Sequence, residues 1–428
     1  MTTRLLRRTL AATLAAALLA TAAHAQGNAS AAATAMGGAY SAVARNFNAV
    51  AWNPANLGLP GNSRFSLALS PQVALGTGPI TGADISDYAG IVVPQQVREQ
   101  WLQKVIDNGG QDLSGDIHLT PLAISVGRFA LAATTTINTD GELPPAVAEL
   151  LLFGNAGRTG TPQDYELRQL AMDANVISTV GLSYGRRVPL VPIGELSLGV
   201  TAKYLMGHGA ASLRDNGSTI TSNPLAIALD APLVVTDTGK VVSGRGFGLD
   251  VGASWKVGAL QASAVVHDLV SSFAWETDHL YYLPVRATFQ QGSSSTVTDS
   301  LVPLSSAPAD VQAALRGRIE DVAPTPSIAL GVAWTGTRRL TLAAELRQRF
   351  GEGIELGPET QVGLGAELRL IPFVPLRAGV SALGDQMRLS GGIGFEFGVV
   401  NLQLAGMLMQ AEQRNDTGFG ITLSFGGR

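Results

Sequence analysis

Apolar residues in this chain recur at every second position over short stretches, and after residue 26 they never form an unbroken run of about 18 residues. The stretches 64–70, 328–334, 341–347 and 364–370 follow this pattern, with small, polar or charged residues between the apolar ones. A period of two is that of a β-strand with one apolar face. Charged residues make up only 14% of the chain, against about 25% in soluble domains. The pattern therefore predicts an all-β fold, a transmembrane antiparallel β-barrel with lipid outside its strands.

Turn signals divide residues 62–428 into fourteen expected strands. They lie near 63–76, 118–127, 129–139, 174–185, 195–209, 244–255, 259–270, 325–335, 338–350, 361–371, 375–381, 386–397, 399–408 and 417–426. Short connections fall near 127–128, 186–194, 256–258, 335–338, 371–375 and 397–399. Longer ones fall near 78–117, 139–173, 210–243, 271–324, 351–360, 382–385 and 409–416. Short turns at one end and longer loops at the other are typical of an outer-membrane barrel, and closure requires the first and last strands to pair.

Several features of the loops and strand ends refine this picture. Helices are expected at Pro94–Asp107 and Pro144–Phe153, each ending at a glycine, in two of the long loops. The apolar run 280–288 is interpreted as loop structure, because another barrel strand would make the count odd. Aromatic girdles at the membrane interfaces explain five residues near strand ends without a ligand. These residues are Tyr184, Tyr204, Trp255, Trp275 and Trp334.

The first residues carry an export signal. Arg4, Arg7 and Arg8 precede an apolar stretch at 10–22, and Ala23-His24-Ala25 fits a small-residue cleavage site. This pattern predicts a signal peptide at 1–25 and a mature chain that begins at Gln26. Together with the barrel pattern it predicts a location in the outer membrane of a Gram-negative cell.

Motifs for catalysis and for metal or nucleic-acid binding are not supported. The stretch 181–185 has the spelling of a nucleophile elbow, but a Pro-rich turn and a strand follow it where the elbow needs a helix. The glycines at 244–248 miss the dinucleotide spacing, and the histidines have no metal-ligand spacing. The chain has no cysteine and no basic tract. We expect no enzyme activity, no metal, no cofactor and no nucleic-acid partner.

The Ala- and Gly-rich segment 26–61 precedes the first strand and has two alternative fates, in the periplasm or inside the barrel as a plug. It contains Met36-Gly37-Gly38-Ala39-Tyr40 and Trp52-Asn53-Pro54-Ala55-Asn56. These motifs, with patches at 203–207, 246–252 and 363–379, resemble the FadL-type family of outer-membrane transporters, which includes PorV-like and TraF-like relatives. The resemblance implies a fourteen-stranded barrel with an N-terminal hatch. The resemblance places five residues in that hatch and on the ligand path, namely Gly37, Gly38, Asn53, Pro54 and Ala55. The alternative is that the turn at 53–55 only positions the chain before the first strand.

Charged residues occupy inward positions of neighbouring expected strands. They are Glu345, Arg347, Arg349, Glu367, Arg369 and Arg377. One interpretation is a cationic anchor for a carboxylate headgroup. The other is a salt-bridge ladder that braces the lumen, because two Glu partly neutralise four Arg.

The resemblance implies passive uptake of a hydrophobic small molecule, such as a long-chain fatty acid. The loops 210–243 and 271–324 correspond to those that build an outer hydrophobic groove in the family. The strand 129–139 has no Gly or Pro and so does not predict the family's lateral opening. Two alternatives remain, a barrel that holds a partner protein at its loops for secretion or conjugation, and a structural barrel. Expected partners are membrane lipid and the barrel assembly machinery, because the last strand, 419–425, resembles its C-terminal signal although Gly426-Gly427-Arg428 follow it.

Overall fold

A computed structural model describes residues 30–427 apart from short gaps. The gaps are 156, 190, 224, 238, 285, 291–295, 298–299, 321–323, 338, 352–358, 385 and 411–414. The predicted signal peptide lies outside the described residues.

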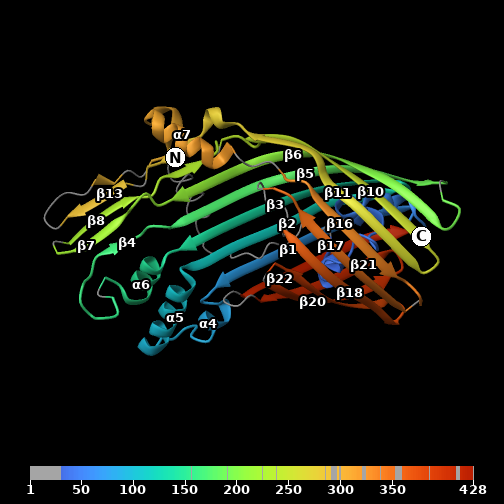
Figure 1. Ribbon diagram of the computed structural model, residues 1–428, viewed down its shortest axis with the longest axis horizontal. Coiled ribbons are helices and arrows are strands. Elements are labelled where there is room, and N and C mark those ends of the chain that lie inside the picture. The colour runs from blue at the N-terminus through green and yellow to red at the C-terminus, as the bar shows by residue number, and fades with distance from the viewer. Residues whose placement is uncertain are drawn as a thin grey trace.

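Fourteen long antiparallel strands close into a barrel (Figure 1). They are β1 (Phe65–Gly78), β2 (Gln111–Val126), β3 (Phe129–Leu143), β5 (Ala171–Val188), β6 (Glu195–Arg214), β10 (Gly244–Val257), β11 (Leu260–Trp275), β16 (Ser327–Trp334), β17 (Leu340–Arg349), β18 (Thr360–Ile371), β19 (Val374–Leu383), β20 (Gln386–Phe397), β21 (Val400–Gln410) and β22 (Asn415–Gly427). β1 pairs with β22, from Phe65 opposite Gly427 to Thr77 opposite Asn415. The predicted fold class, strand count and closure are confirmed.

Side chains alternate between the two faces of the wall, as the period of two predicts. In β16, Leu330 and Val332 are 46% and 56% exposed, whereas Ala329 and Ala333 are buried. Large apolar side chains are exposed in this way on strands all around the barrel. Among the described residues, no helix combines the length and apolar character that crossing a membrane would require.

Exposed aromatic residues gather at the end of the barrel where the short turns lie, here called the short-turn end. They are Phe65, Phe129, Trp255, Trp334, Phe373, Phe397 and Phe425. Tyr184 packs against Phe129 with the ring centroids 4.8 Å apart. An aromatic belt is typical of a membrane interface. The girdle interpretation is wrong for Trp275, which is buried among the loops because its neighbours are apolar loop residues.

The opposite, long-loop end carries most of the remaining elements. The helices there are α4 (Gly82–Ser86), α5 (Gln95–Asn108), α6 (Pro145–Phe153) and α7 (Ala309–Glu320), with η3 (Thr277–His279) and η4 (Leu304–Ser306). α5 and α6 confirm the two predicted helices. β9 (Leu233–Val235), β12 (Tyr281–Leu283) and β15 (Val302–Pro303) join the barrel sheet at this end.

A second sheet, of five strands, lies beyond the barrel (Figure 1). It consists of β4 (Tyr165–Glu166), β7 (Thr219–Ser222), β8 (Leu225–Asp230), β13 (Arg286–Gln290) and β14 (Thr296–Val297). The run 280–288, interpreted from the sequence as loop structure, instead contributes to β12 and β13. Both strands pair with other loop strands, so the barrel count stays even.

Residues 30–61, here called the N-terminal segment, lie inside the barrel (Figure 1). The segment forms four short helical pieces, α2 (Ala31–Ala35), η1 (Asn46–Asn48), α3 (Ala49–Trp52) and η2 (Pro54–Gly58). α2 packs against β19–β22, and η2 packs against β5, β6 and β10. The segment is therefore a plug that touches opposite parts of the wall.

Candidate functional site

The predicted hatch turn is fastened to the wall by buried polar groups. Asn53 is fully buried; its Nδ2 donates to Ala253 O and Ser254 Oγ, both at 3.2 Å, and its Oδ1 accepts from Ala55 N at 3.0 Å. Ser197 Oγ donates to Ala55 O at 2.6 Å. The Asn side chain starts η2, with Pro54 at the first helical position, as Asn and Pro commonly do. The turn is thus bonded to β6 and β10.

A second attachment lies at Gly37. Its carbonyl accepts from Gln361 Nε2 at 2.8 Å and from Arg388 Nη2 at 2.9 Å. Gly37 and Gly38 have φ of 64° and 74°, which favours glycine at both positions. Gly379 of β19 lies so close that a Cβ there would meet Gly37 N at 2.2 Å. Only glycines on both sides allow this approach of two backbones.

A cavity of about 150 Å³ adjoins the N-terminal segment on the side of the long loops. Val50 and Ala51 of the segment line it, and the remaining lining comes from the wall. Its hydroxyl groups come from Thr134, Thr136, Thr179, Thr325 and Ser327, and its charged or titratable groups from Lys203, Asp250, His267, Asp268, Arg347 and Arg349. The middle of the lumen is therefore polar.

One side of this cavity is a buried charge cluster of β6, β10 and β11. Lys203 Nζ lies 2.7 Å from Asp250 Oδ1 and 2.7 Å from Asp268 Oδ1. His267 Nδ1 lies 3.2 Å from Asp250 Oδ2. Burying such charges is tolerated only when they are paired.

A bulge in β11 builds this cluster. Residues His267–Leu269 lie opposite the single residue Asp250, and Asp268 has φ of 52°. The bulge turns two consecutive polar side chains, His267 and Asp268, into the lumen, which a regular strand cannot do. Asp268 N donates to Asp250 Oδ1 at 2.8 Å, so the irregular backbone is bonded to the cluster that it creates.

The predicted lumen charges lie inward but form two separate groups. In the first, Glu345 Oε2 accepts from Tyr40 N at 2.9 Å and Ser41 N at 2.7 Å, and Glu345 Oε1 accepts from Arg347 Nη2 at 3.1 Å. The guanidinium carbon of Arg347 lies 4.9 Å from the ring centroid of buried Trp52. This group links the N-terminal segment to β17, and Arg347 and Arg349 also line the cavity.

The second group does not line the cavity. Glu367 accepts from Arg369 Nε at 2.7 Å and from Arg377 Nε at 2.8 Å. Arg369 forms a bidentate pair with Glu396, at 2.7 and 2.9 Å. With each charge matched, this group has the geometry of a salt-bridge ladder.

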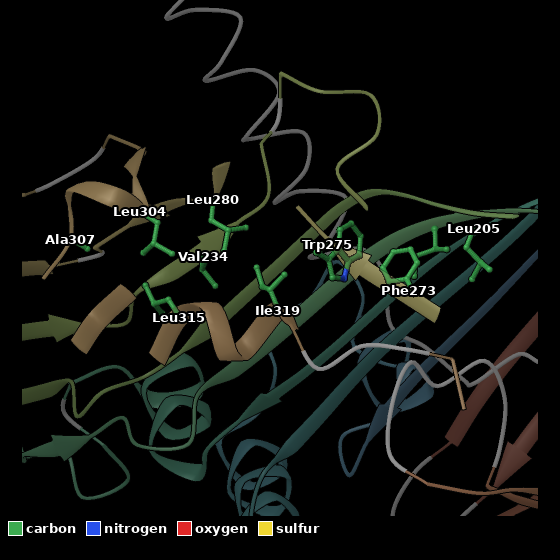
Figure 2. Packing of buried hydrophobic residues seen from close by; sticks show 10 residues of the cluster. Leu205, Val234, Phe273, Trp275, Leu280, Leu304, Ala307, Leu315 and Ile319 are labelled. Carbon is green, nitrogen blue, oxygen red and sulfur yellow. The ribbon is translucent and has the colours of Figure 1, made fainter. Parts of the chain in front are cut away.

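An apolar cluster lies among the elements of the long-loop end (Figure 2). Its members are Ile177, Leu205, Val234, Phe273, Trp275, Leu280, Leu304, Ala307, Leu315 and Ile319. Here called the loop core, it joins α7 to β9, to η4, to β5 and β6, and to the end of β11. The loops 210–243 and 271–324 meet, because β9 pairs with β12 and β8 pairs with β13, and apolar side chains of both loops pack together in the loop core. Leu205 belongs to the loop core and also lines the cavity, so the two adjoin.

β3 follows the expectation from its sequence. It pairs with β5 from Phe129 opposite Tyr184 to Glu142 opposite Ala171 with no shift of register. A nearby irregularity lies in β2 at Thr120 and Pro121. The register shifts there both in the pairing with β1 and in the pairing with β3.

Sequence reasoning missed Lys203, Asp250, His267 and Asp268 as a group, and also Arg388 and Glu396. Two adjacent polar residues at 267–268 interrupt the alternation of β11, and this signal could have identified the bulge. Among the described residues, no group of three or more His, Cys, Asp or Glu side chains is placed to hold a metal ion.

Comparisons with known proteins agree with this architecture. Residues 58–240 match the model of a family of unknown function (DUF5723). No curated protein sequence matches the chain. The toluene transporter TodX of P. putida has a TM-score of 0.54 and 12% identity, over 94% of this chain and 99% of TodX. The toluene transporter TbuX of Ralstonia pickettii also has a TM-score of 0.54 and 12% identity, over 95% and 100%. The monoaromatic hydrocarbon channel CymD has a TM-score of 0.50 and 10% identity, over 93% of this chain and 97% of CymD.

At such identities the likeness shows the fold alone. That fold is the FadL-type barrel, as the motifs of residues 36–57 predicted.

Proposed function

We propose that this protein resides in the outer membrane and takes up hydrophobic small molecules passively through a lumen that the N-terminal segment closes. TodX and TbuX are toluene transporters and CymD is a monoaromatic hydrocarbon channel, and all three share this fold. This likeness supports transport rather than catalysis as the role of the barrel. The cargo class that we favour is a long-chain fatty acid.

The order of environments along the lumen carries this proposal. From the long-loop end inward there follow the apolar loop core, Leu205, the polar cavity, and then Val50 and Ala51 of the N-terminal segment. A molecule with an apolar tail and a polar head matches this order. A pure hydrocarbon would leave the buried charges of the cavity facing apolar surface, which is unfavourable.

The cationic side of the cavity suits a carboxylate head. Arg347 and Arg349 line the cavity from β17, and Arg binds carboxylates through two parallel hydrogen bonds. This is the anchor interpretation of the predicted charge group, restricted here to the two arginines that reach the cavity. The ladder Glu367, Arg369, Arg377 and Glu396 has no part in it.

The volume of the cavity leads us to expect that the plug moves during passage. A cavity of about 150 Å³ matches one that holds benzene in another protein, whereas drug-sized ligands occupy roughly 300–1,000 Å³. A long-chain fatty acid therefore does not fit in the closed lumen. Its passage needs a displacement of Asn53, Pro54 and their neighbours, which close the lumen toward the short-turn end.

The alternative is a barrel that holds a partner protein at its loops. The observation in its favour is the five-stranded sheet β14-β13-β8-β7-β4, which lies outside the barrel sheet. An ordered sheet beyond the membrane wall is a surface on which another protein could dock.

A comparison of two ligands tests the proposal. The purified barrel is titrated with a long-chain fatty acid and with the alcohol of the same chain length, and the bound ligand is quantified by mass spectrometry. We expect the acid to bind at least tenfold more tightly than the alcohol, a difference of about 1.4 kcal/mol. Arg347→Gln/Arg349→Gln should remove this preference, and Arg369→Gln, in the ladder, should keep it.

The opposite results are equally informative. If neither ligand binds the wild-type barrel, uptake of fatty acids is refuted and the partner-binding barrel becomes the better explanation. If both bind equally, the cargo is hydrophobic but the arginines are not its anchor.

A further inference from the structure

The short turns carry a strong excess of positive charge. Their basic residues are Arg64, Arg128, Arg186, Arg187, Lys256 and Arg339, counting the described residues of these turns and of the strand ends beside them. By the same count there are two carboxylates. Glu195 pairs with Arg187 at 2.6 Å, and Glu396, next to the end of β20, pairs with a seventh basic residue, Arg369, at 2.7 Å. By contrast, the loop 79–110 at the other end has four carboxylates and two basic residues. The barrel is thus positively charged at its short-turn end.

Three of these arginines lie on consecutive strands. Gly127 N donates to Arg64 O at 3.0 Å, and Gly185 N donates to Arg128 O at 3.1 Å. The strands β1, β2, β3 and β5 follow one another around the wall (Figure 1). Neighbouring strands are about 4.8 Å apart, so Arg64, Arg128 and Arg186 fall within about 15 Å along the rim.

Aromatic residues neighbour these arginines in the chain and lie at the same depth along the wall. Phe65 follows Arg64 and Phe129 follows Arg128, and both rings are exposed. Tyr184 packs on Phe129, and Arg186 is two positions from Tyr184, on the same face of β5. Aromatic rings of this kind sit at the level of lipid headgroups, which places the three guanidinium groups where lipid phosphates lie.

All three arginine side chains are exposed, and no ion pair joins them to a carboxylate within the described part of the chain. Their guanidinium groups are therefore free to bind an anion. Arg binds phosphate through two parallel hydrogen bonds, and a basic cluster at a membrane surface attracts anionic lipid.

We propose that Arg64, Arg128 and Arg186, with Phe65, Phe129 and Tyr184, form a binding site for the headgroup of an anionic glycerophospholipid. The lipid belongs to the leaflet at the short-turn end, and its acyl chains lie along the exposed apolar faces of β1–β5. The site fixes the depth of the barrel in the membrane on this side. It is independent of the cargo and of the movement of the plug.

Lipid competition tests this site. Delipidated barrel in a neutral detergent receives equal amounts of dioleoylphosphatidylglycerol and dioleoylphosphatidylcholine, and bound lipids are counted by native mass spectrometry. We expect phosphatidylglycerol to be preferred. Each arginine should contribute about fivefold to this preference, so Arg64→Gln/Arg128→Gln/Arg186→Gln should reduce it by up to about one hundredfold.

A matched variant separates the effect of these three arginines from the effect of the net charge of the protein. Lys104→Gln/Arg158→Gln/Arg168→Gln removes three positive charges at the long-loop end, and should keep the preference. The proposal is overturned if Arg64→Gln/Arg128→Gln/Arg186→Gln keeps the preference for phosphatidylglycerol. It is also overturned if the wild-type barrel shows no such preference, which is the outcome expected if this rim docks an acidic protein instead. Sodium phosphate and sodium chloride of equal ionic strength should reduce the preference equally by screening. A loss in phosphate alone would overturn the proposal, since the site would then take free phosphate.

Discussion

At the scale of single residues, glycines of the wall decide how closely the plug approaches it. A Cβ on Gly379 would meet Gly37 N at 2.2 Å, and one on Gly199 would meet Ala55 N at 2.3 Å. Both neighbours are backbone atoms, which cannot move aside as a flexible side chain can. The plug is thus held where the wall lacks side chains, and its hydrogen bonds form only because of this contact.

Gly379→Ala should detach the region around Gly37 without unfolding the barrel. The methyl group would displace Gly37, whose carbonyl accepts from Gln361 and Arg388, and losing buried hydrogen bonds costs about 1–3 kcal/mol. Hydrogen exchange of residues 30–61 should therefore be about tenfold faster or more. Gly391→Ala is the control, because the nearest atom to its Cβ is Arg377 O at 3.7 Å. Equal exchange in both variants would show that close packing at Gly379 does not hold the plug.

The sequence predicts which charges face the lumen better than it predicts their partners. Glu345, Arg347 and Arg377 are buried, and a charge on the lipid face of a strand would be strongly disfavoured. Their division into two groups depends on the register between strands and on the path of the plug, neither of which follows from one strand alone. The Lys203 cluster depends on a bulge in β11, which breaks the alternation used to assign faces.

At the scale of elements, the barrel strands are predictable because lipid and lumen impose the same alternation on each of them. The expected bounds of 386–397 agree with β20, whereas β5 and β6 extend beyond the expected 174–185 and 195–209. The additional residues 171–173 and 210–214 lie at the long-loop end, where no membrane enforces a pattern, whereas 186–188 extend β5 at the short-turn end. The short strands β4, β7–β9 and β12–β15 were not predicted. Some of them pair with strands of another loop, as β8 does with β13 and β9 with β12, and others form short local pairs, as β7 does with β8. α7 was also missed, although Pro308 and Asp310 at its start are typical of a helix N-terminus.

Leu315→Ala should loosen the loops and leave the barrel intact. Leu315 of α7 is 1% exposed within the loop core, and truncating such a residue costs about 2–5 kcal/mol. Because α7 donates no hydrogen bond to the barrel ladder, the cost should fall on the loops. Hydrogen exchange should rise in 277–319 while the barrel strands keep theirs. Leu151→Ala on α6, where the side chain is 74% exposed, should change stability by less than about 0.5 kcal/mol. A loss of protection throughout the barrel would contradict this division.

At the scale of the whole molecule, wall and plug are two bodies joined by apolar packing and by hydrogen bonds. The wall closes on itself through β1 and β22 and needs no contribution from the plug to satisfy its backbone. Apolar side chains of the plug, such as Phe47, Val50 and Met36, pack against small residues of the wall. Hydrogen bonds to lumen side chains add to this packing, such as those that Asn56 Oδ1 accepts from Ser254 and Gln261. Such bonds exchange with water at a small net cost, typically 0.5–1.5 kcal/mol each. A plug held in this way can leave the wall while the wall remains folded, as uptake through the lumen would require.

A reversible cross-link between the two bodies tests this movement directly. The chain has no cysteine, so a pair introduced by mutation forms the only disulfide. Ser41 Oγ of the plug and Ser263 Oγ of β11 lie 3.0 Å apart, which suits Ser41→Cys/Ser263→Cys. Oxidation should abolish uptake of a labelled long-chain fatty acid into proteoliposomes, and reduction should restore it. Ser66→Cys/Ser125→Cys joins β1 to β2 within the wall, where the Oγ atoms are 2.6 Å apart, and should leave uptake unchanged in both states. Normal uptake by the oxidised Ser41→Cys/Ser263→Cys barrel would mean that cargo passes without release of the plug from β11.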